Sequence, residues 1–324
     1  MNLPRMGLGC MSLSHGYGPA VPVEDGIRML RTAIDDGVTF LDTATMYGGG
    51  RNEELVGRAL VGRRDDVILA SKGGMAPVDG VKTIDGRPDN LRAHVDASLR
   101  RLGVDHIDLY YLHRWDKTVP IGDSVGALAE AVAAGKIGAI GLSEVSVARL
   151  REAQAVAPIA AVQNEYSLWT RNPELGMLDA TRQDGVALVA FSPTARGYLA
   201  DAVHDIGALA AGDLRTINPR FLGDAWQANL TLLPEWRSLA SEAGCTPAQL
   251  ALAWLLSRGD QVIPIPGSTN LAHVRENAAA AGATIEPVLL ARAGDLINHA
   301  TVSGPRYDAN QSREVDAETF EDAA

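Results

Sequence analysis

The sequence predicts a single α/β barrel of eight parallel strands, each followed by a helix. Eight short apolar runs are nearly continuous rather than alternating, which is typical of strands buried on both faces of a parallel sheet. Longer amphipathic stretches separate these runs, and such alternation of strand and helix favours an α/β architecture. The length of 324 residues suits one such barrel, so we expect one domain over residues 1–324.

The eight expected strands end near Met11, Asp42, Lys72, His113, Ser143, Asn164, Ser192 and Ile265. The eight expected helices cover residues 24–36, 52–60, 88–102, 122–134, 146–156, 174–184, 247–258 and 270–281. An open doubly wound sheet is the structural alternative. It is disfavoured because the chain has no G-x-G-x-x-G between a strand and a helix, and no Walker-type phosphate loop.

The composition restricts the kinds of partner. The net charge is −11 and there is no long basic run, which argues against nucleic acid or an anionic membrane as the main partner. The two cysteines, Cys10 and Cys245, lie far apart and do not resemble a disulfide framework. No apolar run approaches the ~18 residues that span a bilayer, and no signal peptide is evident. We therefore expect a soluble, cytoplasmic protein.

Two longer segments stand outside the strand–helix pattern. The connection from Thr194 to about Trp226 follows the seventh strand, and a loop of that length in a compact domain is usually functional. The tail from about Ser303 is polar and acidic. We expect both segments to lie at the end of the barrel where such folds carry their chemistry.

Polar or ionisable side chains stand at the ends of six consecutive apolar strands. In a barrel these ends meet at one rim, which is where active sites lie. Each residue alone has a structural explanation, such as a cap or a solvated strand end, but six together favour an active site. No metal is expected, because there is no H-E-x-x-H and His106 and His113 would point to opposite faces of a strand. The residues at the strand ends are Asp42, Lys72, His113, Ser143, Gln163 with Asn164, and Ser192.

Four residues near this rim are of the types that together add a proton to a carbonyl oxygen. A tyrosine hydroxyl such as that of Tyr47 has a pKa near ~10, and an adjacent cation such as Lys72 lowers this pKa. Asp42 would keep Lys72 charged, and His113 would donate a hydrogen bond to a developing oxyanion. Such a set is suited to general acid catalysis while hydride arrives at carbon. Because no side chain supplies hydride, a nicotinamide cofactor is implied.

These residues lie in motifs that resemble those of the aldo-keto reductases, from about Gly7 to about Tyr307. The stretch N-E-Y-S-L-W-T-R at 164–171 is similar to the branch that includes pyridoxal reductase and perakine reductase. The resembling motifs are D-T-A-T-M-Y-G at 42–48, A-S-K at 70–72, Y-L-H-R at 111–114, G-L-S-E at 141–144, V-Q-N-E-Y-S at 162–167, F-S-P-T-A-R-G at 191–197, T-P-A-Q-L-A-L-A-W at 246–254, P-G-S-T-N at 266–270 and R-E-N at 275–277.

The resemblance implies an α/β barrel that reduces an aldehyde or ketone with NADPH, with Tyr47 as proton donor, Lys72 and Asp42 tuning it and His113 orienting the carbonyl. Tyr47, His113 and Trp115 are the expected substrate contacts. Trp115, Trp169 and Met46 are candidates for lining an apolar substrate pocket. Cofactor contacts are implied for Met11, Asp42, Ser143, Glu144, Gln163, Phe191, Ser192, Pro193, Thr194, Arg196, Arg220, Gly267, Ser268, Thr269, His273, Glu276 and Asn277.

The chain departs from many relatives in three places. Glu144 stands where many carry Asn or Arg, and only six residues precede Gly7, so the N-terminal hairpin that plugs the barrel floor is short or absent. Thr269 and Asn270 stand where relatives often have a basic residue that grips the 2′-phosphate. We therefore expect NADPH to be preferred over NADH, but by less than in those relatives, with NADH as the alternative nucleotide.

Two other functions remain open at the level of sequence. Lys72 at a strand end would suit a Schiff-base lyase, although a close carboxylate keeps a lysine protonated and therefore non-nucleophilic. A non-catalytic nucleotide-binding barrel that serves a regulatory role is the second alternative, and the complete set of four catalytic residues disfavours it.

Overall fold

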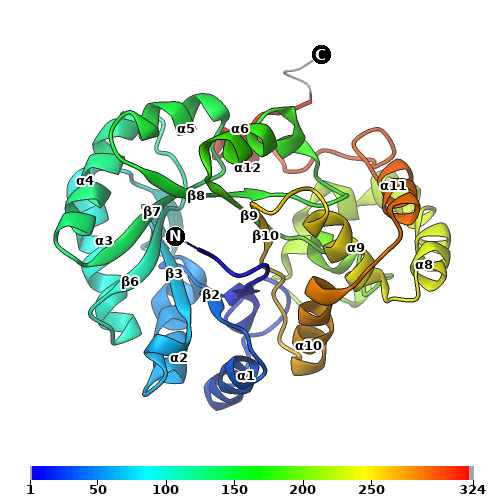
Figure 1. Ribbon diagram of the computed structural model, residues 1–324, viewed down its shortest axis with the longest axis horizontal. Coiled ribbons are helices and arrows are strands. Elements are labelled where there is room, and N and C mark those ends of the chain that lie inside the picture. The colour runs from blue at the N-terminus through cyan, green and yellow to red at the C-terminus, as the bar shows by residue number, and fades with distance from the viewer. Residues whose placement is uncertain (1, 321–324) are drawn as a thin grey trace.

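The computed structural model describes residues 2–320 and contains one curled sheet of eight parallel strands. This confirms the expected parallel sheet with helices between its strands (Figure 1). The order in the sheet is β1-β2-β3-β6-β7-β8-β9-β10. The strands are β1 (Leu8–Gly9), β2 (Phe40–Asp42), β3 (Ile68–Gly73), β6 (Ile107–Leu112), β7 (Ile137–Ser143), β8 (Ile159–Glu165), β9 (Ala187–Phe191) and β10 (Val262–Pro264).

The two ends of the sheet are joined by backbone hydrogen bonds. The N–H of Gly7 donates to Pro264 O at 3.0 Å, and the N–H of Gly9 donates to Pro266 O at 3.3 Å. A Cβ at Gly9 would lie 2.9 Å from Ile265 O, so only glycine permits this close approach. The sheet thus curls far enough for its first and last strands to meet.

Side chains alternate between two cores, as the period of two along a strand requires. Phe40, Leu109 and Tyr111 belong to an inner cluster within the curled sheet. Their neighbours Leu41 and Tyr110 belong to the larger core between sheet and helices. The inner cluster fills the interior, so the sheet is packed rather than open along its axis.

Helices cover the outside of the sheet, and Figure 1 shows α8 and α11 to one side of it. The predicted helices all form, with ends that differ from prediction by up to three residues. Helix α9 begins with a capping box in which the Thr246 hydroxyl accepts from Gln249 N–H. The helices are α1 (Val23–Asp35), α2 (Arg51–Leu60), α3 (Pro88–Leu102), α4 (Ile121–Ala133), α5 (Val147–Gln154), α6 (Met177–Asp184), α7 (Gly223–Leu230), α8 (Leu233–Glu242), α9 (Pro247–Leu256), α10 (Leu271–Ala279), α11 (Pro287–Leu296) and α12 (Ala309–Arg313).

Several elements were not predicted. An antiparallel hairpin of β4 (Met75–Val78) and β5 (Val81–Ile84) follows β3, and α7, α8, α11 and α12 are additional helices. The long connection after β9 contains four short 3₁₀ turns. The tail is ordered as far as it is described, and Asp316 N–H donates to Glu144 O at 3.0 Å, at the carboxyl end of β7. The expectation that the tail covers this end is confirmed.

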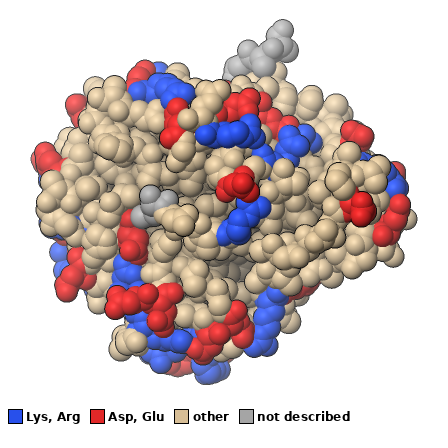
Figure 2. All heavy atoms as spheres, in the orientation of Figure 1, with Lys and Arg blue, Asp and Glu red and all other residues tan. Residues whose placement is uncertain are grey.

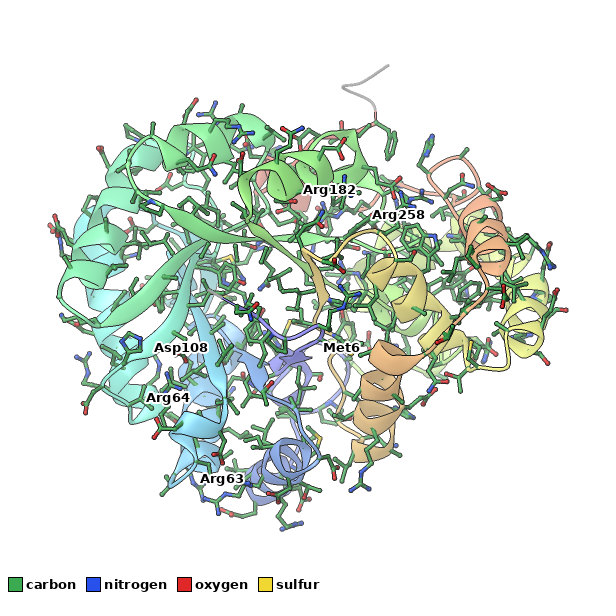
Figure 3. The ribbon with its side chains drawn as sticks, viewed as in Figure 1. Met6, Arg63, Arg64, Asp108, Arg182 and Arg258 are labelled. Carbon is green, nitrogen blue, oxygen red and sulfur yellow. The ribbon has the colours of Figure 1, made fainter. Side chains whose placement is uncertain are left out.

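The opposite end of the sheet holds the start of the chain. Leu3 packs against the inner cluster from this end. Figure 3 shows Met6 near the middle of the ring of strands. Acidic and basic side chains are interspersed on the face shown in Figure 2. Within residues 2–320 no helix is long and apolar enough to cross a membrane.

Candidate active site

A buried ion pair occupies the carboxyl ends of β2 and β3. Lys72 has no exposed surface, and Asp42 is only 1% exposed. The Lys72 ammonium pairs with the Asp42 carboxylate and also donates to Thr43 O at 2.9 Å and to the Tyr47 hydroxyl at 3.2 Å. Gln163 Nε2 donates to the other Asp42 oxygen at 2.8 Å. The ammonium is therefore fixed between a carboxylate and a phenol.

A glycine-rich turn sets the position of Tyr47. Gly48, Gly49 and Gly50 have φ values of 59°, 66° and 93°, in the left-handed region that favours glycine. The turn leads directly into α2, whose Asn52 accepts a hydrogen bond from the Thr43 hydroxyl at 2.6 Å. The tyrosine is thereby held over the ends of β2 and β3.

Burial and charge act against each other in this group. Burial raises the pKa of Tyr47, and the attraction of Lys72 lowers it without cancelling that rise. Lys72 thus acts in the predicted direction, but the desolvation of the phenol outweighs it. Burial lowers the pKa of Lys72, while Asp42 and Tyr47 together raise it above its ordinary value. Lys72 is therefore a fixed cation at neutral pH.

His113 completes the predicted group. It follows β6, and its ring lies edge-on to Tyr47 with centroids 5.8 Å apart. Burial, followed by the charges of Arg114 and Lys72, lowers the pKa of His113 well below 6.5. Its Nδ1 has no hydrogen-bond partner among the described residues. The imidazole is therefore neutral at pH 7 and can donate one hydrogen bond.

These side chains line one end of a cavity of about 520 Å³. Most of the predicted cofactor residues line the same cavity, from the carboxyl ends of the strands to the start of α10. The fully buried Lys72 lies behind its wall. The predicted residues that line it are Met11, Asp42, Met46, Tyr47, His113, Ser143, Gln163, Phe191, Ser192, Pro193, Thr194, Arg196, Gly267, Ser268, Thr269, His273, Glu276 and Asn277.

Four predicted residues lie away from the cavity wall. Trp115 donates from its indole N–H to Val119 O at 2.9 Å, and Trp169 packs against Tyr198 within the core. Arg220 donates to Trp169 O, Thr170 Oγ1 and Gly304 O. Glu144 is turned inward and only 1% exposed. Each of these four side chains is therefore engaged within the protein rather than at the cavity wall.

Glu144 belongs to a buried charge network that joins the tail to the strand ends. Arg306 pairs with Glu144 at 2.5 Å and with Glu165 at 2.9 Å. Arg196 also pairs with Glu165, at 3.2 Å. Burial raises the pKa of Glu165, but Arg306 and Arg196 more than offset this and lower the pKa to about 2. The tail residue Arg306 thus fixes two carboxylates beneath the cavity.

Strained backbone is concentrated at the same end of the sheet. Glu144, Ser192, Ala195 and Arg196 have φ values between 50° and 58° although none is glycine. Such conformations cost on the order of 1–3 kcal/mol each and persist where the surroundings impose them, often at functional sites. Three of the four belong to the segment just after β9, which lines or adjoins the cavity.

Sequence reasoning missed several residues of the wall. His15 lies edge-on to Tyr47 with centroids 5.6 Å apart, and burial lowers its pKa. Lys82 from β5 and Glu314 from the tail also line the cavity and pair at 2.5 Å. Arg114 and Tyr307 are further lining residues. Arg114 was part of a quoted motif, whereas nothing in the local sequence marked the others.

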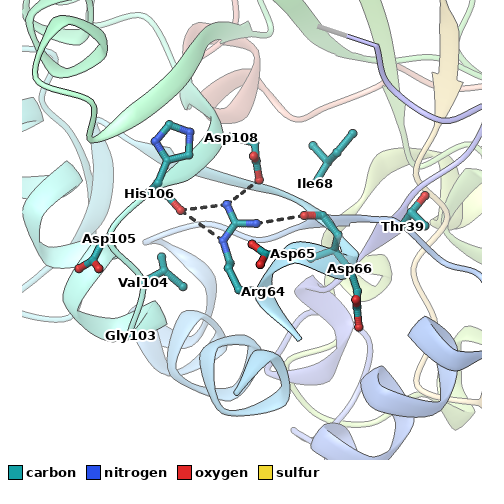
Figure 4. A pocket seen from close by; sticks show the side chains of 11 residues that line it. Thr39, Arg64, Asp65, Asp66, Ile68, Gly103, Val104, Asp105, His106 and Asp108 are labelled. Carbon is teal, nitrogen blue, oxygen red and sulfur yellow. Dashed lines mark hydrogen bonds and ion pairs between the residues drawn. The ribbon is translucent and has the colours of Figure 1, made fainter. Parts of the chain in front are cut away.

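A second hollow lies at the amino-terminal ends of β3 and β6 (Figure 4). Arg64 is central to it and pairs with Asp108 at 2.6 Å, and these residues are labelled side by side in Figure 3. Arg64 also donates to His106 O and Val67 O. Its polar groups thus bind one another, and the hollow lies at the opposite ends of the strands from Tyr47.

The fold is that of an α/β protein, and comparison with known proteins shows the family. Residues 5–288 match the model of the Aldo/keto reductase family. The chain is 38% identical to aldo-keto reductase yakc of Schizosaccharomyces pombe, whose name includes NADP(+), over 98% of this chain and 95% of that protein. The chain therefore belongs to the aldo/keto reductase family.

Two solved structures are also similar. The glycerol dehydrogenase AKR11B4 from Gluconobacter oxydans has a TM-score of 0.84 and 29% identity, with 94% of each chain covered. An aldo/keto reductase from Klebsiella pneumoniae in complex with NADP and acetate has a TM-score of 0.72 and 29% identity. That match covers 94% of this chain and 95% of the other.

Proposed function

We propose that this protein reduces an aldehyde or ketone to an alcohol with NADPH, with Tyr47 as the general acid. The observation that carries the proposal is the position of Lys72, whose ammonium is held between Asp42 and the Tyr47 hydroxyl beside the neutral His113. This arrangement offers a proton and a hydrogen-bond donor at one point of a cavity wall.

The proposal includes a closed (β/α)₈ barrel, formed as one domain, with the active site at the carboxyl ends of its strands. The hydrogen bonds from Gly7 and Gly9 to Pro264 and Pro266 support closure. The position of Asp42 and Lys72 at the ends of β2 and β3 supports the location of the site, since barrel enzymes carry catalytic residues at that end.

NADP(H), when bound, supplies the hydride that reaches the carbonyl carbon. Tyr47 transfers its hydroxyl proton to the carbonyl oxygen as negative charge develops there. Lys72 stabilises the resulting tyrosinate, and Asp42, oriented by Gln163, keeps Lys72 in place. His113 donates a hydrogen bond to the same carbonyl oxygen. The products are the alcohol and the oxidised nucleotide, and Tyr47 regains its proton from solvent.

The cavity suits this nucleotide. Phe191 and Ser12 both line the cavity, and the buried Ser12 hydroxyl has no partner among the described residues. Arg196 and residues at the start of α10 line the same cavity, and a cation and the N–H groups of a helix N-terminus favour phosphate. The names of the yakc relative and of the Klebsiella complex include NADP(+) and NADP, which supports NADP(H) as the cofactor.

A Schiff-base mechanism fits less well. Lys72 has no exposed surface and its pKa lies above the ordinary value, so the ammonium cannot act as a free amine at neutral pH. A non-catalytic nucleotide-binding barrel would differ from the proposed enzyme only in the absence of turnover, so an activity assay distinguishes the two.

The test is NADPH consumption by the purified protein with a panel of aliphatic and aromatic aldehydes. Replacing Tyr47→Phe removes one hydroxyl and keeps the ring, so we expect kcat to fall on the order of 10²–10⁴-fold with little change in nucleotide affinity. Tyr17→Phe is the control, because Tyr17 also lines the cavity and its hydroxyl contacts Arg196 rather than Lys72. Nucleotide binding without turnover of any carbonyl would favour the regulatory alternative.

A further inference from the structure

The Lys and Arg side chains that line the cavity differ in whether a carboxylate pairs with them. Lys82, Arg196 and Arg215 each pair with a carboxylate, at 2.5, 3.2 and 2.6 Å respectively. Arg114 also lines the cavity, but it forms no ion pair with any described residue. Its charge is therefore not compensated by a neighbouring acid, although its side chain is partly buried.

The hydrogen bonds of Arg114 leave its Nη2 without a partner among the described residues. Nη1 donates to His113 O at 2.7 Å and to Ser143 Oγ at 3.1 Å. Nε is buried without a partner among residues 2–320, and Nη2 makes no hydrogen bond to the described chain. Because Nε is buried, Nη2 is the nitrogen that remains to donate a charge-assisted hydrogen bond to a carboxylate oxygen.

The place of Arg114 in the sheet separates it from the expected phosphate positions. It follows β6, which is three strands from β9 and four from β10 in the order of the sheet. The segments after β9 and β10 carry Arg196 and the start of α10, where the nucleotide phosphates are expected. Arg114 instead adjoins His113 and is near enough for its charge to lower the pKa of Tyr47. An anion bound to it would belong to the reacting molecule.

We propose that Arg114 is a specificity-determining residue that binds a carboxylate of the substrate, so that the preferred substrates are carbonyl compounds that carry a carboxylate. This inference rests on the proposed function. The carboxylate accepts from Nη2 of the guanidinium while the carbonyl oxygen meets Tyr47 and His113. No bond is made or broken at Arg114, which acts by binding and orientation alone.

The first experiment compares short linear aldehydes that carry a terminal carboxylate with their methyl esters, which have nearly the same shape and no charge. We expect kcat/KM for the acid to exceed that for the ester by about 10- to 100-fold, as for a hydrogen-bonded charge pair. In Arg114→Met this ratio falls to near one. In Arg114→Lys, which keeps the charge but not the planar guanidinium, part of the ratio remains.

The matched control removes a different cation together with its counter-ion. In Lys82→Met/Glu314→Gln the net charge of the cavity wall is unchanged, so the ratio of acid to ester is expected to stay at the wild-type value. Equal kcat/KM for acid and ester in the wild type, or an equal loss for both in Arg114→Met, would overturn the proposal. That result would mean that Arg114 only orients His113 and Ser143.

A second measurement does not depend on turnover. Butanoate is titrated calorimetrically into the protein saturated with NADP⁺, and its affinity is expected to fall about 10-fold or more in Arg114→Met. If no aldehyde is reduced but butanoate binds in an Arg114-dependent manner, the proposed function fails and the carboxylate site stands. If aldehydes are reduced but butanoate binds equally to both proteins, the carboxylate site fails alone.

Discussion

Lys72→Met tests the electrostatic account of the active site most directly. Methionine has a similar length without charge, so the variant removes the cation that lies 3.2 Å from the Tyr47 hydroxyl. At that distance and an effective dielectric constant of about 20, a cation and a tyrosinate attract by about 5 kcal/mol. Asp42 opposes this attraction, but its effect on the pKa of Tyr47 is the smaller of the two.

The loss of Lys72 therefore raises the pKa of Tyr47 further and destabilises the developing tyrosinate. If half of the attraction is present in the transition state, the barrier to reduction rises by about 2.5 kcal/mol, roughly a 70-fold loss in kcat. In the direction of alcohol oxidation the tyrosinate is the base, so the rate rises with pH toward the pKa of Tyr47. Lys72→Met should move this rise to higher pH.

The assay is kcat against pH in both directions, with nucleotide affinity and thermal unfolding measured on the same samples. Lys136→Met is the control, since Lys136 pairs with Asp96 at 2.6 Å and is 43% exposed, outside the cavity. A folded Lys72→Met protein with the wild-type rate and pH profile would refute the assignment of Lys72 as the residue that tunes Tyr47.

Two further predictions concern the nucleotide and the tail. Arg275 pairs with Asp36 at 2.7 Å, so it is not available to the 2′-phosphate, and Asn270 caps α10. Thr269→Arg adds a cation and spares this cap, so it should raise the ratio of kcat/KM for NADPH to that for NADH by about tenfold or more. A parallel change for both nucleotides would contradict this. Arg306→Met should lower the free energy of unfolding in urea by about 3–5 kcal/mol at pH 7, because Glu144 and Glu165 lose their shared cation. The pKa of Glu165 is lowered to about 2, so the stability it contributes is present above about pH 4.3 and is lost as the pH falls toward 2. The difference between wild type and variant should shrink over the same range, and a constant difference would exclude Glu165 as its source.

Much of the fold could be predicted because the barrel strands are short apolar runs with helices between them. The hairpin β4–β5 was missed although its turn carries a signal, since Asp79-Gly80 joins the two strands and both residues have positive φ. Helices α8 and α11 also begin with a proline in the first turn, a typical start signal. These elements lie outside the strand–helix alternation, which drew attention away from their local signals.

The active site could be predicted as far as it depends on strand ends. Adjacent parallel strands end at or next to Asp42, Lys72 and His113, so the pairing of these strands alone brings the three residues together. The role of Glu144 could not be inferred in this way. Its partner Arg306 lies 162 positions away, and the left-handed backbone at Glu144 accompanies a side chain turned inward. The opposing effect of burial on Tyr47 was also invisible, because sequence gives proximity to a cation but not desolvation.

The pairing of charges around the cavity explains why Arg114 matters more than its motif suggested. Asp42, Glu144 and Glu165 are nearly inaccessible, and each is held by a cation from another part of the chain. A buried carboxylate without such a partner would be destabilising, so these pairs are required for folding whatever the substrate. Arg114 has no equivalent structural need for an acid, because its Nη1 already binds His113 O and Ser143 Oγ. Arg114 also lines the cavity in which the proposed function places the reacting carbonyl compound.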